Sequence, residues 1–461
     1  MLRVMHPRGT LLATIVGSSL AFIDGSVVNV ALPALAYDLK AAPATLSWAI
    51  NAYLLPLGAL ILLGGALGDH FGRRLFFQIG LLAFTVASAG CAVSPSMGWL
   101  LAARGLQGLG AALLLPNSLA ILGGGFVGEA RGRAIGTWAA AGALAGALGP
   151  IVGGWFIDTI GWRTIFLLNL PIAAAAGFLA WKYVEERKEM QRAAPLDGIG
   201  AALATAALGL LTWALTDASA FSTQGHPWSW AAAAAGVALF GAFVRYEGKL
   251  GDRAIVPLAM FAAPTFVGLT LLTFFLYGSL GGLLVLLPFF LIKIEHWLAI
   301  AAGAALLPVP VLIGLGSRWM GRIAARYGER LPLAIGAGLV GIGLALYGRM
   351  EAHGIDYWRD VFPPTFLIAL GMGACVAPLT TAVMASVDAE HAGMASGFNS
   401  AVARVAGLIA TALLGFVFAR EGSVETFMAG FRAAALIGAA SALLAAGSAL
   451  VLIDSRTASA R

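Results

Sequence analysis

Residues 22 to 33 read FIDGSVVNVALP and lie inside an apolar run that extends from about Thr10 to Ala36. Such a run is long enough to cross a lipid bilayer as a helix, because the hydrocarbon core corresponds to about 20 apolar residues. At about 1.5 Å per residue, Asp24 lies roughly 20 Å along this helix, near the middle of the membrane. The stretch therefore predicts a membrane-spanning helix with one carboxylate near its centre.

The composition of the whole chain is typical of a membrane protein. Of its 461 residues, 60% are apolar and 11% are charged, and the mean hydropathy is +0.89. Soluble proteins carry about a quarter charged residues. The net charge of +6 could indicate a nucleic-acid partner, but the basic residues lie in short connectors between apolar runs, as they do in membrane proteins. We therefore expect the lipid bilayer, and no nucleic acid, as a partner.

The sequence shows none of the usual signatures of an enzyme. Its two cysteines, Cys91 and Cys375, each lie within an apolar run, so they form neither a disulfide framework nor a metal-ligand spacing. A phosphate-binding loop and a nucleophile motif are also missing. We therefore expect a non-enzymatic protein without cofactor or metal, driven by a proton gradient rather than by hydrolysis of ATP.

The apolar runs predict an all-α integral membrane protein with fourteen transmembrane helices. A charged segment over residues 181–195 follows the sixth run and indicates a helical cytoplasmic linker. The expected spans are residues 10–36, 46–68, 75–94, 98–123, 134–157, 164–184, 197–216, 229–248, 264–291, 297–319, 331–349, 362–386, 393–418 and 428–453.

The basic residues predict the orientation of these spans. An even number of spans places both ends on one side, and the connectors on that side are rich in arginine, as at Arg131 and Arg133. The opposite connectors hold few basic residues, such as Lys40 and Arg163. Because cytoplasmic loops carry the excess of basic residues, we expect a multi-pass protein of the plasma (inner) membrane with both termini in the cytoplasm.

Two connectors resemble each other and indicate an internal repeat. Residues 65–74 read GALGDHFGRR and residues 321–330 read GRIAARYGER, with matching glycines, an aromatic residue and a final arginine. Parallel repeats of this kind build transporters whose binding site lies at the interface of the repeats. We therefore predict an N-terminal six-helix bundle over residues 1–184, a linker with two inserted helices over 185–256, and a C-terminal six-helix bundle over 257–461.

Asp24 is the strongest candidate for a functional group. An ionised carboxylate at mid-membrane costs about 2.5 to 3.5 kcal/mol on insertion scales, so such residues usually face a water-filled cavity on an ion pathway. Burial also favours the neutral acid, which brings protonation into reach. These properties indicate a proton carrier. The alternative is a carboxylate that a partner neutralises and that only fixes the packing.

Arg104 is the expected partner of Asp24. It lies in LLAARGLQGLGAA, residues 100–112, on the fourth span, and its depth differs from that of Asp24 by roughly 6 Å. An arginine side chain can reach that far. A pair would favour the ionised carboxylate while burial favours the neutral one, and the sequence does not decide between them. The alternative is an arginine that extends to the outer interface.

Two further motifs are candidates for conformational roles. Residues 142–154 read GALAGALGPIVGG, and their glycines form a flat face for close helix packing, while Pro150 removes one backbone hydrogen bond. Packing alone explains this motif. Asp69, Arg73 and Arg74 form a charged cluster in the first connector, which is either a loop that fixes topology or a latch that holds Asp69 near the N-terminus of a facing helix.

Taken together, these motifs resemble those of the 14-helix drug:proton antiporter (multidrug efflux) family of the major facilitator superfamily. IDGSVVNVALP resembles the first-helix motif, GALGDHFGRR the loop motif GxLaDrxGrk, RGLQGLGAA the fourth-helix motif and GALAGALGPIVGG the fifth-helix antiporter motif. Three further pieces also match: LSWAINAYLL, GWRTIFLLNLPI and AGMASGFNSAVARVAG. The resemblance covers essentially the whole chain, with His70 as a departure where arginine is usual.

The resemblance implies roles for several of these residues. Asp24 would belong to a membrane-embedded acidic site, and Arg104 would assist proton movement. Gly149 and Pro150 would shape the exchange pathway, and Asp69 and Arg73 would act in conformational gating, with Arg74 beside them. The candidate substrate contacts, a polar or aromatic set, are Asp24, Asn29, Trp48, Tyr53, Phe274 and Tyr277.

We therefore predict proton-coupled secondary active export by alternating access. We find no second carboxylate near mid-membrane in the first bundle, so proton and substrate would compete for Asp24, which favours lipophilic cations, although apolar cavities also accept neutral drugs. The alternatives are a proton-coupled importer or a non-transporting membrane sensor of small molecules. The glycine motif argues against an importer, and the lack of a soluble output domain argues against a sensor. Whether a periplasmic adaptor is needed stays open.

Overall fold

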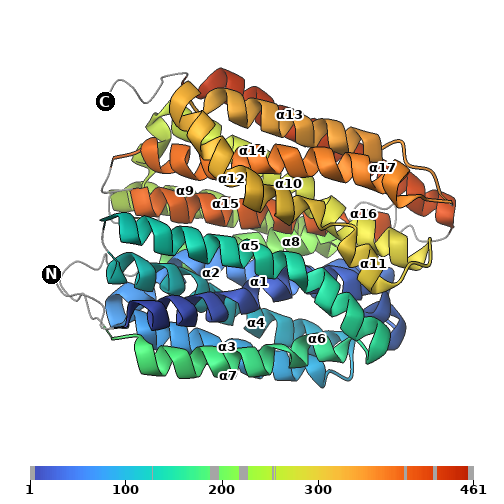
Figure 1. The fold of residues 1–461 in the computed structure, drawn as a ribbon, viewed down its shortest axis with the longest axis horizontal. Helices are drawn as coiled ribbons and strands as arrows, with labels where there is room; N and C mark the ends of the chain where they lie inside the picture. The colour runs from blue at the N-terminus through green and yellow to red at the C-terminus, as the bar shows by residue number, and fades with distance from the viewer. Residues whose placement is uncertain are drawn as a thin grey trace. The chain divides into compact units, whose positions relative to one another are not determined.

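The computed structural model describes residues 6–126, 128–186, 197–216, 227–251, 254, 256–352, 354–388, 392–418 and 423–454. Regular secondary structure in these ranges is entirely helical (Figure 1). Thirteen helices among the described residues are long and apolar enough to cross a membrane. The prediction of an all-α membrane protein is therefore confirmed.

Contacts between Cα atoms divide the chain into two units. The first comprises residues 1–42, 48–211 and 231–255, and the second comprises residues 43–47, 212–230 and 256–461. In the first unit α1 packs against α4, α5 and α7, and α3 packs against α4. Its helices are α1 (Pro7–Asp38), α3 (Arg73–Ala92), α4 (Met97–Gly125), α5 (Gly128–Thr159), α6 (Arg163–Leu167) and α7 (Asn169–Tyr183), with most of α2 (Pro43–Phe71), α8 (Gly198–Thr216) and α9 (Pro227–Leu250).

The second unit is built around α10 and α14. α10 packs against α15 and α17, and α14 packs against α12 and α13. The helices of this unit are η3 (Leu258–Ala262), α10 (Pro264–Lys293), α11 (Ala299–Ala304), α12 (Pro308–Tyr327), α13 (Arg330–Tyr347), η4 (Tyr357–Val361), α14 (Phe362–Ala385), α15 (Ala392–Leu413), α16 (Gly415–Phe418) and α17 (Val424–Leu452).

Three expected spans differ in detail from the helices observed. The span expected over 164–184 is interrupted at Leu168, which separates α6 from α7, and the span over 297–319 is split between α11 and α12. The span over 393–418 is helical as α15 and α16, but it is not among the thirteen apolar helices. α15 carries Asn399 and Arg404, which make it more polar than its neighbours.

The two repeat connectors fold alike. Gly72, the eighth residue of the first connector, has φ +126°, and Gly328, the eighth of the second, has φ +86°. Each glycine ends one helix just before the next begins, at α2 and α3 in the first unit and at α12 and α13 in the second. Glycine adopts positive φ without the steric penalty of a Cβ atom, which explains its place in both connectors. Residues 187–195, most of the charged linker expected over residues 181–195, lie outside the described residues.

Candidate functional site

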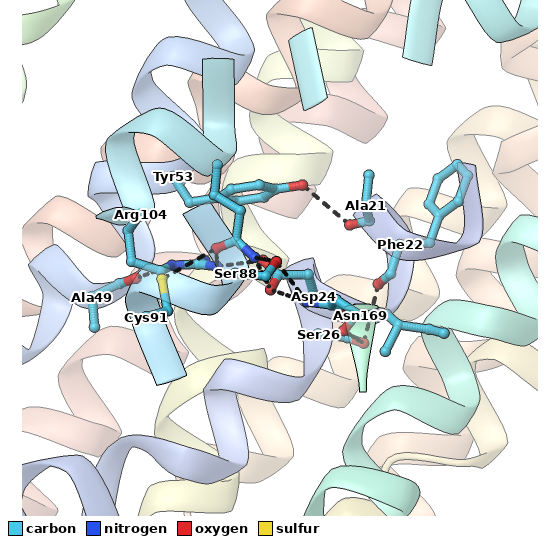
Figure 2. A network of polar contacts seen from close by, with 12 residues as sticks. Ala21, Phe22, Asp24, Ser26, Ala49, Tyr53, Ser88, Cys91, Arg104 and Asn169 are labelled. Atoms are coloured by element: carbon cyan, nitrogen blue, oxygen red, sulfur yellow. Dashed lines mark hydrogen bonds and ion pairs between the residues drawn. The ribbon is translucent and has the colours of Figure 1, made fainter. Parts of the chain in front are cut away.

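The centre of the first unit holds a buried ion pair. Asp24 on α1 is 0% exposed and Arg104 on α4 is 1% exposed, and Nη1 of Arg104 donates a hydrogen bond to Oδ2 of Asp24 (Figure 2). The guanidinium points inward, so the alternative in which it extends to the outer interface does not hold here. Removing one partner of a buried pair leaves an uncompensated charge, so each of these residues depends on the other.

Neutral polar side chains complete the surroundings of the carboxylate. Gln107 on α4 donates through Nε2 to Oδ1 of Asp24 at 2.8 Å and to Oγ of Ser88 on α3 at 2.9 Å. Asn169, the first residue of α7, donates through Nδ2 to the same two atoms, at 3.4 Å to Oδ1 and 3.2 Å to Ser88 Oγ. All three neutral residues are 0% exposed. Four helices therefore meet at one carboxylate.

Arg104 has partners besides Asp24. Its Nε donates to the carbonyl oxygen of Ala49 on α2 at 3.0 Å, and its Nη1 also donates to Oε1 of Gln107 at 2.7 Å. The guanidinium carbon lies 4.5 Å from the ring centroid of Tyr53 and 6.0 Å from that of Phe166. Aromatic faces attract cations at such distances. The positive charge would thus keep several contacts if Asp24 became neutral.

The glycine face of α5 packs on α1 beside Asp24. A Cβ atom on Gly149 would lie 3.0 Å from the carbonyl oxygen of Ile23 and closer still to Oγ of Ser26, and Pro150 next to it is also buried. Two α5 turns before Gly149, Gly142 faces the ring of Phe22, and one turn after it, Gly153 faces Val27. The predicted close packing is present, and its partner is the segment of α1 that carries the carboxylate.

The charged cluster of the first connector is held together locally. Nε of Arg73 donates to Oδ1 of Asp69 at 2.7 Å, and Nη1 donates to the carbonyl oxygen of Ala120 on α4 at 3.1 Å. Nη2 of Arg74 donates to the carbonyl oxygen of Trp181 at 3.0 Å. The backbone amides of Arg74 and Leu75, in the first turn of α3, bond the carboxylate of Glu186. The carboxylate at this helix N-terminus is thus Glu186, and the latch role of Asp69 stays a prediction.

The candidate substrate contacts are distributed over both units. Tyr53 is buried beneath Arg104, and its hydroxyl donates to the carbonyl oxygen of Ala21 at 3.2 Å. Asn29 and Trp48 are partly exposed. Phe274 and Tyr277 lie on α10 in the second unit and are also partly exposed. Their roles stay predictions.

Sequence reasoning missed three residues of this site, Gln107, Ser88 and Asn169. Gln107 follows Arg104 by three positions, so helical geometry alone places both on one face of α4. Ser88 and Asn169 carry no such signal, because neutral hydroxyls and amides are common in membrane helices. A buried charge stands out against an apolar run, whereas the groups that solvate it do not.

The fold and the site define the class of protein. Many helices long and apolar enough to span a membrane, two units with a related connector and a buried ion pair are typical of a polytopic transport protein. Residues 14–411 match the family model of the Major Facilitator Superfamily. The chain therefore belongs to this superfamily and is a transport protein rather than an enzyme.

Similar proteins and structures agree with this assignment. The chain is 33% identical over 414 residues to the multidrug resistance protein Stp of Mycobacterium tuberculosis (strain CDC 1551 / Oshkosh). This match covers 89% of this chain and 75% of Stp. It is 31% identical to the tetracenomycin C resistance and export protein of Streptomyces glaucescens, over 91% of this chain and 77% of that protein. The crystal structure of a D-xylose-proton symporter shares the fold, with a TM-score of 0.67, 16% identity and 97% coverage of both chains.

Proposed function

We propose that the chain exports lipophilic small molecules, cations among them, in exchange for protons through alternating access. The names of the relatives support a role in drug resistance, since one is a multidrug resistance protein and another a resistance and export protein. The observation that carries the proton-coupling part is Asp24, a carboxylate with 0% exposure in the middle of a membrane span. Buried acids inside membrane spans commonly belong to proton pathways.

The geometry around Asp24 supports a simple exchange cycle. In the conformation described, Arg104 neutralises Asp24, so a cationic substrate would have to displace the guanidinium to reach the carboxylate. A proton that enters from outside and binds Asp24 removes the attraction to Arg104, which keeps its bonds to Ala49 and Gln107. Return of that proton to the cytoplasm restores the pair. Exchange of one proton for one monovalent cation moves no net charge, so its driving force is the pH difference, about 1.4 kcal/mol per pH unit. For a neutral substrate each proton also gains about 2.3 kcal/mol per 100 mV.

Ethidium, a lipophilic cation, tests this proposal in cells. Cells that produce the protein should retain less ethidium than cells with an empty vector, and a protonophore should abolish the difference. Asp24→Asn should behave as the empty vector, whereas Asp38→Asn, on the same helix, should export normally. Greater ethidium retention than in the empty-vector cells would instead support the importer, and export insensitive to the protonophore would contradict proton coupling.

We also propose that both termini face the cytoplasm of a plasma (inner) membrane. The chain has two cysteines, Cys91 and Cys375, and both are buried. A cysteine appended after Arg461 should therefore be the main site of thiol labelling. A membrane-impermeant maleimide should label it in inverted vesicles and not in intact cells, and labelling in intact cells would contradict this orientation.

A further inference from the structure

The groups around Asp24 suit its ionised form. Each polar side chain among the described residues that bonds the carboxylate does so as a donor, through Nη1 of Arg104, Nε2 of Gln107 and Nδ2 of Asn169. An ionised carboxylate only accepts hydrogen bonds, so this arrangement satisfies it. A neutral carboxylic acid has an O–H group as well, which needs an acceptor. If Asp24 carries a proton in the transport cycle, the site must supply that acceptor.

One acceptor beside Asp24 is unused. Oε1 of Gln107 already accepts from Arg104 at 2.7 Å and from the thiol of Cys91 at 3.7 Å. Oγ of Ser88 accepts from both amides. Oδ1 of Asn169 is buried, and it has no hydrogen-bond partner among the described residues. A buried acceptor without a partner is costly and requires an explanation.

We infer that Asn169 is the positioning residue that accommodates both protonation states of Asp24. When Asp24 takes up a proton, the side-chain amide of Asn169 turns over and its Oδ1 accepts the new O–H. The bond given up, from Nδ2 to Oδ1 of Asp24, is the longest hydrogen bond to the carboxylate among the described residues, at 3.4 Å. The two ends of an amide have almost the same shape, so this exchange needs no movement of α7. The inference rests on the proposed function, because it assumes that Asp24 is protonated during transport.

The proton balance of this step is simple. The proton comes from bulk water and ends on Asp24, while Arg104 stays a cation throughout. After the amide has turned, the hydroxyl of Ser88 can donate to Oδ1 of Asn169, because a hydroxyl both donates and accepts. Asn169 therefore keeps a hydrogen bond to Ser88 in both orientations of its side-chain amide. In the orientation described, Oγ of Ser88 lies 3.2 Å from Nδ2.

The other charged or titratable groups that face Asp24 are few among the described residues. They are Arg104 from α4, the thiol of Cys91 from α3 and the phenol of Tyr53 from α2. The α5 surface packed against this part of α1 contributes glycines, Gly142, Gly146, Gly149 and Gly153, and no charge. A pH-dependent change at Asp24 should therefore depend mainly on Arg104 and on the amides.

Infrared difference spectroscopy of the full-length protein in lipid, recorded as a function of pH, tests the inference. The carbonyl band of a protonated acid is assigned to Asp24 by its loss in Asp24→Asn. In Asn169→Leu the neutral acid loses its acceptor, so this band should move to a higher wavenumber. Asn169→Thr, which keeps a group able to donate and accept, should give a smaller move. Asn51→Leu is the matched control, because this buried amide on α2 has no hydrogen-bond partner among the described residues.

Each outcome separates this inference from the proposed function. If Asp24→Asn loses no carbonyl band, Asp24 never carries a proton, and this result contradicts the proposed function itself. A band that is present but has the wild-type position in both Asn169 variants would overturn the role of Asn169 alone. If Asn169→Leu fails to fold, Asn169→Thr decides, and a wild-type band position there overturns the inference. A shift of the same size in Asn51→Leu would also overturn it.

Discussion

Helix α1 carries two aspartates that each bond an arginine, and their surroundings differ. Asp24 and Arg104 are 0% and 1% exposed, whereas the side chains of Asp38, the last residue of α1, and Arg163, the first residue of α6, are each 44% exposed. Trp162 also donates to Oδ2 of Asp38 at 2.9 Å. The ionic chemistry is the same in both pairs, so solvent access is the variable. A carboxylate on this helix becomes a candidate for transport chemistry where a buried arginine, rather than water, stabilises its negative charge.

The largest expected difference between the two pairs is in stability. Arg104→Leu leaves Asp24 buried without its counter-charge, and removing one partner of a buried pair typically costs about 3 to 5 kcal/mol. Thermal unfolding of the purified protein in detergent should show a large fall in Tm. The double variant Asp24→Asn with Arg104→Leu should recover part of it, because no charge is then unpaired. If Arg104→Leu had the same Tm as Arg163→Leu, the buried and the exposed pair would not differ in their contribution to stability.

The next effect concerns the packing that holds Asp24 in place. Gly149→Ala puts a Cβ atom against the carbonyl oxygen of Ile23 and the hydroxyl of Ser26, on the α1 turn that carries Asp24. Overpacking of this kind costs about 1 to 3 kcal/mol, and ethidium export should fall with it. Gly136→Ala is the matched control on the same helix, since nothing lies within 4 Å of the added atom. Equal Tm and export in the two variants would show that the α1 contact does not matter.

The smallest effect belongs to the exposed pair. Arg163→Leu should lower the free energy of unfolding by about 0 to 1 kcal/mol, because half-exposed ion pairs contribute little and are screened by salt. Thermal unfolding at low and high salt should show that this small loss shrinks as salt rises. The effect of Arg104→Leu should change much less with salt. A loss of several kcal/mol for Arg163→Leu would remove the contrast between the pairs.

Much of the fold could be predicted from the sequence because spans of apolar residues have a fixed minimum length in a bilayer. The repeat was visible because its glycines are required by the backbone, as the positive φ of Gly72 and Gly328 shows. The interruption at Leu168 has a local cause that the span prediction did not use: Pro171 lacks the N–H that would bond the carbonyl oxygen of Leu167, four residues earlier. The polarity of α15 made its expected span less apolar than the rest.

The candidate site was predictable in its charges and not in its neutral groups. Asp24 and Arg104 stood out because a charge inside a membrane is costly, and helical rise placed them within reach of each other. Which residues would surround the pair depended on how α3, α4 and α7 pack, and such packing leaves no local signal at Ser88 or Asn169. The glycines of α5 likewise predicted close packing without indicating that α1 is the partner.

Proton counterflow in sealed proteoliposomes tests the central claim most directly. With a pH-sensitive dye trapped inside, an imposed ethidium gradient should drive proton movement in the opposite direction in the wild-type protein. Asp38→Asn should give the same signal, and Asp24→Asn should give none although the protein is folded and inserted. Proton counterflow of wild-type size in Asp24→Asn would contradict the account, because the buried carboxylate would then not be the group that carries the proton.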